Sequence, residues 1–198
     1  WLWLADAVGS GCQYAQELLT LYPDPAELYD ALRAGTEAPP ACLTPHALAQ
    51  LRDTTPFDYE ERLDHCLLSG IDVLTPDEGV YPDRLRDLPD LPLALYVTGD
   101  IGCLNGRRYA AMVGAGQADV PTVAFLGTAI DKTYPASNAK LRTAIEKGGG
   151  AVCSEYPPGY SGRTTGTFLA RNRLIAAQSE ALCVAEARTR SGRLNTVG

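Results

Sequence analysis

Histidine and closely spaced cysteine are scarce in this chain, which argues against a metal centre. The 198 residues include two histidines, and no two of the six cysteines form a Cys-x-x-Cys pair. Structural zinc sites need such clustered ligands, and disulfide frameworks are typical of short secreted chains. We therefore expect the cysteines to be reduced core thiols of a cytoplasmic protein, and we expect neither a metal nor a cofactor.

Long apolar runs and the glycine motifs of common nucleotide sites are absent as well. No run approaches the roughly 20 apolar residues of a membrane span, and no signal peptide is recognisable, so we expect no membrane association. Neither Gly-x-x-x-x-Gly-Lys-Ser/Thr nor Gly-x-Gly-x-x-Gly occurs, which disfavours ATP hydrolysis and a dinucleotide cofactor. We expect both natural ends to lie beyond this sequence, the N-terminal one because Trp1 stands where an initiating methionine would be.

Positive charge is scarce in the first half of the chain and concentrated in the second. Residues 1–100 hold 18 acids and 5 bases, whereas residues 101–198 hold 6 acids and 12 bases, within a net charge of −7. Six arginines fall between Arg163 and Arg193, with only Glu180 and Glu186 among them. Phosphate binding needs local positive charge and not a basic whole. The arginine group is therefore either a phosphate-binding surface or a solvated face.

The first 69 residues have the pattern of a small all-helical domain. Helices are expected over 1–8, 14–21, 26–32, 45–52 and 57–69. A Gly9-Ser10-Gly11 turn follows the first of them, which makes the segment similar to a helix-hairpin-helix or SAM-like unit whose turn amides hold DNA phosphate. Since no lysine or arginine precedes Arg33, we favour a structural or interaction module.

Residues 70–198 have an alternating strand and helix pattern. Strands are expected over 70–74, 95–98, 109–113, 122–126, 151–154 and 181–185, and helices over 138–147 and 171–178. This alternation predicts an α/β domain, a Rossmann-like parallel sheet with helices on both faces. Ligands bind such sheets outside the carboxyl ends of the strands, which here are followed by residues 127–134, 155–168 and 186–195.

One connection in this predicted sheet is too short. Only residues 115–121 separate two expected strands, whereas parallel neighbours need a crossover of about a dozen residues. Either the protein has lost two strand–helix units, or residues near 115–121 are missing from the sequence. We expect the second explanation, because a deletion would remove sheet strands and much of the binding cleft.

The side chains of residues 168–173 are of the types that bind nucleic acids. Arg171 and Arg173 flank Asn172 at the start of the helix expected at 171–178. A helix N-terminus attracts anions, and guanidinium groups bind phosphate in a bidentate manner. Phe168 precedes them and has the type of side chain on which single-stranded binders stack a base.

Two other interpretations of these side chains stay open. Phe168 equally fits core packing. Arg173 equally fits an ion pair with a carboxylate such as Glu155 or Glu186.

The same region carries a resemblance to a known family. The matching residues are Asp131, Tyr134, Pro135, Asn138, Ser154, Glu155, Pro157, Gly159, Phe168, Arg171, Asn172, Arg173, Ile175, Glu186, Ala187, Ser191 and Gly192, with Tyr81–Arg86, Pro92 and Leu95–Asp100 before them. In this order they resemble the DNA-processing protein A family, called DprA or Smf, from about Val73 to the end of the sequence.

The resemblance implies a protein that binds single-stranded DNA, protects incoming DNA and helps load the recombinase RecA in natural transformation, as a homodimer and without catalysis. The DNA-binding residues expected on this basis are Arg171, Arg173, Asn172, Phe168, Arg163, Gly114, Ala115, Gly127 and Lys132. The chain departs from the family where Gly-Ser-Arg is replaced by Gly114-Ala115-Gly116-Gln117 and Phe-Pro by Phe168-Leu169.

A second function class is an enzyme. The predicted fold also resembles phosphoribohydrolases that release bases from nucleotides by means of a Pro-Gly-Gly-x-Gly-Thr loop and a glutamate. That loop would fall at Ser191–Asn195, which lacks the glycine cluster, and Glu155 and Glu186 are the carboxylates available. A nucleotide-ligand sensor without catalysis is the third possibility.

Overall fold

The computed structural model describes residues 1–35, 38–113, 121–162 and 165–184, of which 112–113 and 182–184 are described by their backbone alone. The α-helices are α1 (Leu2–Val8), α2 (Ala15–Leu21), α3 (Pro25–Ala34), α4 (Pro45–Asp53), α5 (Glu60–Leu68), α6 (Asp83–Arg86), α7 (Ala139–Lys147) and α8 (Thr165–Gln178). The strands are β1 (Asp72–Leu74), β2 (Leu95–Gly99), β3 (Ala110–Val113), β4 (Val123–Phe125), β5 (Ala151–Ser154) and β6 (Ala181–Val184). Short 3₁₀ turns are η1 (Pro56–Tyr59), η2 (Ile101–Cys103) and η3 (Ala136–Asn138).

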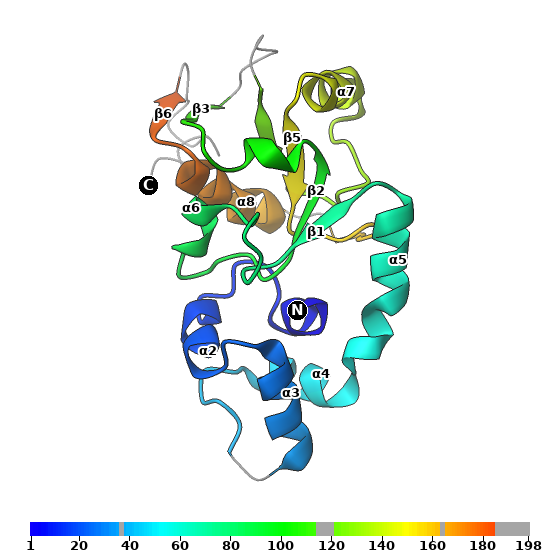
Figure 1. The fold of residues 1–198 in the computed structure, drawn as a ribbon, viewed down its shortest axis with the longest axis vertical. Helices are drawn as coiled ribbons and strands as arrows, with labels where there is room; N and C mark the ends of the chain where they lie inside the picture. The colour runs from blue at the N-terminus through cyan, green and yellow to red at the C-terminus, as the bar shows by residue number, and fades with distance from the viewer. Residues whose placement is uncertain (36–37, 114–120, 163–164, 185–198) are drawn as a thin grey trace.

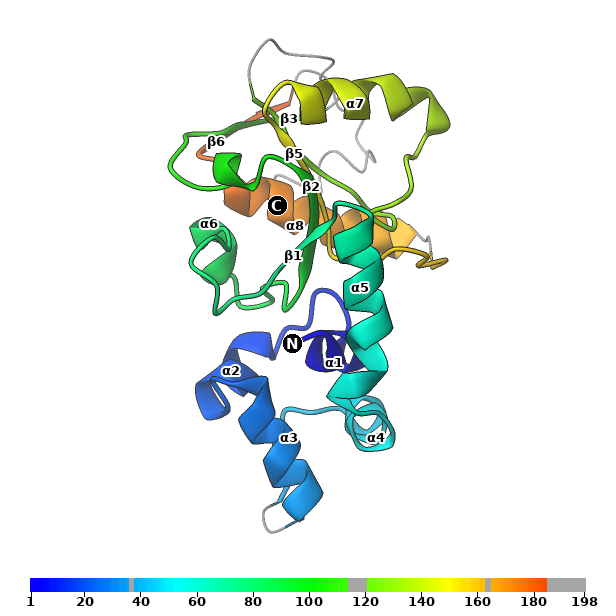
Figure 2. The same cartoon turned by 45° about the vertical axis from the view of Figure 1, so that its right-hand side comes forward.

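Helices α1–α5 form a helical unit at one end of the molecule, and α5 leads from it to the sheet (Figures 1 and 2). Local signals explain where its helices begin. Asp24 accepts from the Ala26 amide at 2.8 Å with Pro25 in the first turn, and Thr44 accepts from the Ala47 amide at 3.1 Å. The helices expected in residues 1–69 are all present, within a few residues of their predicted bounds.

The four-stranded sheet is mixed, which corrects the prediction of a parallel sheet. Its order is β1-β2-β5-β4; β2 runs antiparallel to both neighbours, and only β4 and β5 are parallel. Helix α7 makes the crossover between β4 and β5, as expected. The connection from β1 to β2 holds only the one-turn helix α6, so the chain returns beside β1 in the opposite direction, and β2 becomes an antiparallel strand inside the sheet.

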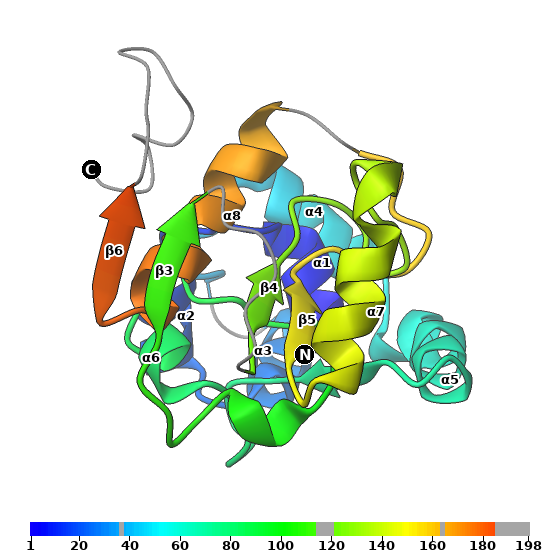
Figure 3. The same cartoon turned by 90° about the horizontal axis from the view of Figure 1, so that it is seen from above.

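Strands β3 and β6 form a separate parallel pair beside this sheet (Figure 3). Their register pairs Ala110 with Ala181 and Val113 with Val184. In the described residues β3 does not pair with β4, its successor in the chain. The expected conflict over the short connection at 115–121 therefore coincides with a break between two sheets, although residues 114–120 lie outside the described part.

Helices cover both faces of the four-stranded sheet, as predicted. On one face, Tyr96 and Val152 belong to a buried cluster that continues through the helical unit and touches Ile145 of α7. On the other face, Val97 and Cys153 pack in a second cluster with Leu174 of α8. The helical unit is thus joined to the sheet by one continuous core, and the proposed domain boundary at residues 69–70 stays a prediction.

The described cysteines are unpaired thiols. Cys12, Cys66, Cys103 and Cys153 are buried and Cys42 is half-buried; the side chain of Cys183 lies outside the described part. Burial raises the pKa of the Cys153 thiol, which keeps it protonated and inert. Within the described residues, no group of three or more metal-ligating side chains forms and no helix is long and apolar enough to cross a membrane.

Candidate nucleic-acid interface

The loops that follow β4 and β5 come together at one edge of the sheet, as the strand-end rule predicted. The Ser154 hydroxyl donates to the Thr128 carbonyl at 2.6 Å, and the Ile130 amide donates to the Tyr156 carbonyl at 3.1 Å. The Gly159 amide donates to Asp131 Oδ2 at 3.0 Å. These contacts hold residues 127–134 against residues 155–162. The third expected loop, 186–195, lies outside the described residues.

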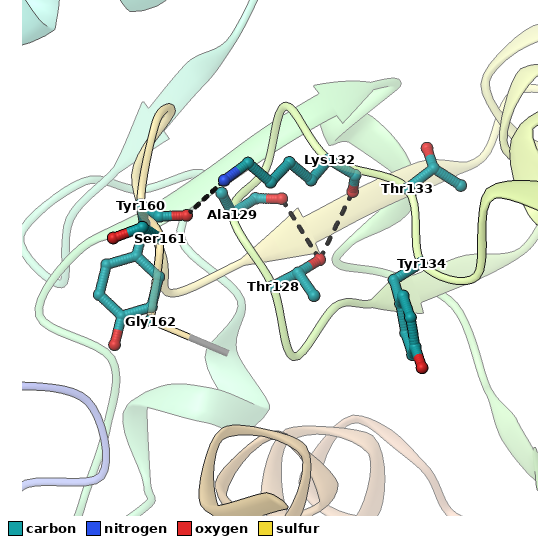
Figure 4. A pocket seen from close by; sticks show the side chains of 8 residues that line it. All are labelled: Thr128, Ala129, Lys132, Thr133, Tyr134, Tyr160, Ser161 and Gly162. Carbon is teal, nitrogen blue, oxygen red and sulfur yellow. Dashed lines mark hydrogen bonds between the residues drawn. The ribbon is translucent and has the colours of Figure 1, made fainter. Parts of the chain in front are cut away.

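An open pocket of about 430 Å³ lies between these two loops (Figure 4). It is lined by Thr128, Ala129, Lys132, Thr133, Tyr134, Tyr160, Ser161 and Gly162. The exposed Lys132 ammonium donates to the Tyr160 carbonyl at 2.9 Å and forms no ion pair with any described carboxylate. A cation that no described carboxylate neutralises therefore lines this pocket.

Gly127 allows α8 to pack directly against the end of β4. A Cβ at Gly127 would lie 2.7 Å from Phe168 Cδ1 and 3.0 Å from Phe168 Cα. The Thr167 hydroxyl also donates to the Gly127 carbonyl at 2.8 Å. Gly127 is therefore a close-approach position that sets the place of α8, and the structure gives no contact that assigns it a ligand.

The position of the arginines on α8 corrects one prediction. The helix begins by Thr165, so Arg171 and Arg173 lie in its second and third turns and not at its N-terminus. Thr165, Gly166 and Thr167 have low helix propensity, but this end of the helix is anchored where Thr167 and Phe168 contact Gly127. The argument from free amides at the helix start therefore does not apply to these two side chains.

Arg171 lies half-buried at the carboxyl end of β4. Its Nη1 donates to the Phe125 carbonyl and its Nε to Asn172 Oδ1 at 3.2 Å, and its guanidinium lies 6.0 Å from the centre of the Phe168 ring. Burial lowers the pKa of the Arg171 guanidinium, which nevertheless stays charged. No described carboxylate forms an ion pair with it. Its positive charge is thus left without an anionic partner in the described structure.

Arg173 is surrounded by acids. Its Nη1 and Nη2 donate to the two Glu155 carboxylate oxygens at 2.7 and 2.6 Å, and Nη2 also donates to the Asp90 carbonyl at 2.8 Å. Nε lies 3.0 Å from Asp90 Oδ2, an ion-pair distance, although its N–H is not aligned for a hydrogen bond. Burial lowers the pKa of Arg173, but hydrogen bonds and charge from Glu155 outweigh burial and raise it overall. For Arg173, the ion pair with Glu155 that the sequence left open is therefore present.

Phe168 and Tyr134 form an aromatic pair next to Arg171. Their ring centres are 5.7 Å apart at 46°, and the Tyr134 residue is 50% exposed. Phe168 is partly exposed, so it combines packing against Gly127 with a surface contribution. Tyr134 also lines the pocket, which connects the Arg171 region with Lys132.

The remaining predicted site residues divide into two groups. Asn172 is buried and its Oδ1 accepts from Arg171 Nε, so it helps to orient the Arg171 side chain. Gly114, Ala115 and Arg163 lie outside the described residues.

Sequence reasoning missed several residues that shape the site. Tyr160 lines the pocket, and Arg142 on α7 donates to the Ile130 carbonyl at 2.7 Å and so braces the loop after β4. Tyr160 is an aromatic residue in a loop rich in glycine, proline and serine, a signal that was available. Nothing in the sequence distinguishes Arg142 from a helix-surface arginine.

Comparison with known proteins agrees with this architecture. A family model described as DNA recombination-mediator protein A matches residues 110–198. The protein Smf of Synechocystis is 31% identical over 193 aligned positions, which cover 75% of this chain and 47% of that relative. The chain therefore spans about half the length of this relative. Since 75% of 198 residues is about 149, the alignment includes a stretch of the relative that has no counterpart here.

Two solved structures share the fold. DNA processing protein A from Streptococcus pneumoniae matches with a TM-score of 0.69 at 20% identity, over 99% of this chain and 80% of that one. The Helicobacter pylori protein, solved to show its single-stranded DNA binding mode, matches with a TM-score of 0.53 at 23% identity, over 64% of this chain and 74% of that one. The family model, the similar relatives and the shared fold together support the assignment of this chain to the DNA-processing protein A (DprA/Smf) family.

Proposed function

We propose that this protein is a recombination mediator that binds single-stranded DNA along the edge formed by the loops after β4 and β5. In this role it protects incoming DNA in the cytoplasm during natural transformation and helps to load RecA, as a homodimer and without catalysis. The family and the single-stranded DNA binding named for the Helicobacter pylori relative support this role. The geometry of the edge supports the DNA contact.

The observation that carries the proposal is the charge of Arg171, which no carboxylate among the described residues neutralises. Taking a guanidinium out of water is unfavourable unless an anion compensates it, and structural arginines such as Arg173 receive carboxylates. Arg171 has only carbonyl and amide acceptors in the described residues. A DNA phosphate would supply the missing charge and accept a bidentate pair of hydrogen bonds.

The neighbouring side chains fit the rest of a nucleotide chain. Phe168 and Tyr134 place exposed aromatic surface beside Arg171, and single-stranded binders use such rings to stack bases without sequence preference. Tyr134 continues into the pocket where Lys132 stands. Cation, aromatic pair and second cation thus follow one another along the edge, which is the order that a phosphate–base–phosphate path requires.

Fluorescence anisotropy of labelled oligo-dT, measured over a salt series, tests the DNA contact. Arg171→Ala should raise the Kd by about tenfold or more, since hydrogen bonds to charged groups contribute roughly 1.5–3 kcal/mol. The matched control is Arg33→Ala, because Arg33 donates to the carbonyls of Arg52 and Thr54 within the helical unit. If the wild-type protein does not bind at low salt, or if both variants bind alike, the proposal fails.

The mediator role needs its own experiment. RecA assembly on oligo-dT coated with single-strand binding protein should start sooner when the protein is added, and light scattering should give twice the chain mass. Unchanged RecA kinetics with a DNA-binding protein would limit the function to DNA binding. A monomer by light scattering would contradict the homodimer.

The structure argues against the enzyme interpretation, because Glu155, its candidate carboxylate among the described residues, is paired with Arg173. Glu155 is 4% exposed at its side chain and engages both terminal nitrogens of Arg173, so it does not face the pocket as a free carboxylate. Glu186 lies outside the described residues. Base release from a nucleoside monophosphate would support hydrolysis, and competition of a mononucleotide against oligo-dT at equal concentration would favour a nucleotide sensor.

A further inference from the structure

We propose that Tyr160 is a base-stacking platform of the DNA site, and that Ser10 and Tyr156 hold this platform in place from the helical unit. The inference rests on the proposed function, because it assigns a further base contact to the same edge. It follows from contacts that join the helical unit to the loop after β5, which are far apart in the sequence.

The first contact joins the helical unit to the loop after β5. Ser10 Oγ lies 2.9 Å from the Tyr156 hydroxyl, within hydrogen-bond distance, and 146 positions separate the two residues in sequence. Gly9 and Gly11 adopt positive φ angles of 74° and 68°, which present Ser10 at the tip of the turn between α1 and α2. The Gly9-Ser10-Gly11 turn therefore contacts the loop after β5 through the Ser10 side chain.

The second contact joins Tyr156 to Tyr160. Tyr156 is 6% exposed, and its ring stacks on that of Tyr160 with centres 4.8 Å apart and an angle of 24° between planes. Tyr160 is 37% exposed and lines the pocket (Figure 4). A ring stacked on a fixed, buried ring has lost its freedom before a ligand arrives, and this lowers the entropic cost of stacking a base on it.

Two further contacts fix the place of the platform. The Tyr160 carbonyl accepts from Lys132 Nζ at 2.9 Å, which holds the ammonium group next to the backbone that carries the ring. Gly162 has no side chain, and a Cβ there would lie 2.4 Å from the Tyr160 hydroxyl oxygen. The loop can therefore fold close to the ring. An aromatic surface and an ammonium group linked in this way match one nucleotide unit, with its base on the ring and its phosphate on the lysine.

The alternative is a purely structural role, in which Tyr160 only shields the Tyr156 ring from water. The two explanations differ in what the ligand must contain. A stacking platform needs bases, whereas a covering residue affects every ligand through the fold.

The experiment compares labelled oligo-dT with an abasic oligonucleotide of equal length, by anisotropy. Tyr160→Ala should weaken oligo-dT binding roughly tenfold or more and leave abasic binding unchanged, whereas Tyr160→Phe should keep both affinities. Ser10→Ala should weaken oligo-dT binding about two- to tenfold with the same selectivity, and Ser10→Thr should restore it. Thermal melting of each variant verifies that the fold is retained.

Each outcome has a definite consequence. Equal losses on both oligonucleotides, or no loss with Tyr160→Ala, would overturn the platform. A protein that binds oligo-dT, loses that binding in Arg171→Ala and ignores Tyr160→Ala would overturn this inference alone. Wild-type protein without any DNA binding would overturn the proposed function together with it.

Discussion

Helix α8 presents two arginines, two positions apart, to two regions of the molecule. Residues at that spacing point to opposite sides of a helix. Arg173 enters a region where Glu155 and Asp90 neutralise it, whereas Arg171 enters the strand-end edge, where only neutral acceptors from described residues meet it. A half-buried arginine with its own carboxylates stabilises the fold, and one without them is available to an external anion.

The largest effect that this comparison predicts is on stability, at Arg173. Arg173→Met should lower the free energy of unfolding by about 3–5 kcal/mol, because it leaves the buried Glu155 charge alone. Urea denaturation measures the loss, and adding Glu155→Gln should recover part of it. The control is Arg62→Met, since the Arg62–Asp6 pair is more exposed, 27% and 32% at the side chains, and should matter less. Equal losses would break the comparison.

A smaller loss is expected where α8 meets β4. Gly127→Ala should lower the free energy of unfolding by about 1–3 kcal/mol, because the new methyl group collides with the Phe168 backbone and moves the helix. Oligo-dT affinity should fall with it, since Phe168 and Arg171 move too. Gly79→Ala, with no atom within 4 Å of the new Cβ, should change neither quantity.

The same substitution at Arg171 should leave the stability of the protein nearly unchanged, in contrast to Arg173→Met. Arg171→Met should shift the free energy of unfolding by less than about 1 kcal/mol, because the lost hydrogen bond to the Phe125 carbonyl is offset by removal of a desolvated charge. Urea denaturation beside Arg173→Met gives the direct contrast. A loss as large as that of Arg173→Met would show that Arg171 is structural.

The smallest effect concerns the second cation of the edge. Lys132→Ala should reduce the slope of log K against log salt by about 0.7, the value for one phosphate contact to a single strand. Lys147→Ala, an exposed lysine at the end of α7, is the control and should leave the slope unchanged. An unaltered slope for Lys132→Ala would remove Lys132 from the DNA path.

Local patterns predicted the elements well and their assembly less well. The strand at 151–154 was predicted to the residue, because a short apolar run after three glycines leaves few alternatives. The direction of β2 was not, because antiparallel pairing with β5 is decided by a connection that the pattern does not describe. The start of α8 was placed six residues late, because residues 165–167 have low helix propensity and the contacts of Thr167 and Phe168 with Gly127 are visible only in the fold.

The candidate site, too, could be predicted from the sequence only in part. Residue patterns indicated the α/β domain, and the ordered motif residues indicated the resemblance to the DprA/Smf family, since these properties are local or additive along the chain. The binding site at the strand ends stays a prediction. Which arginine receives Glu155, and which serine supports Tyr156 across 146 positions, depends on packing between distant segments. Chemically identical side chains acquire different roles only when the fold gives them different neighbours.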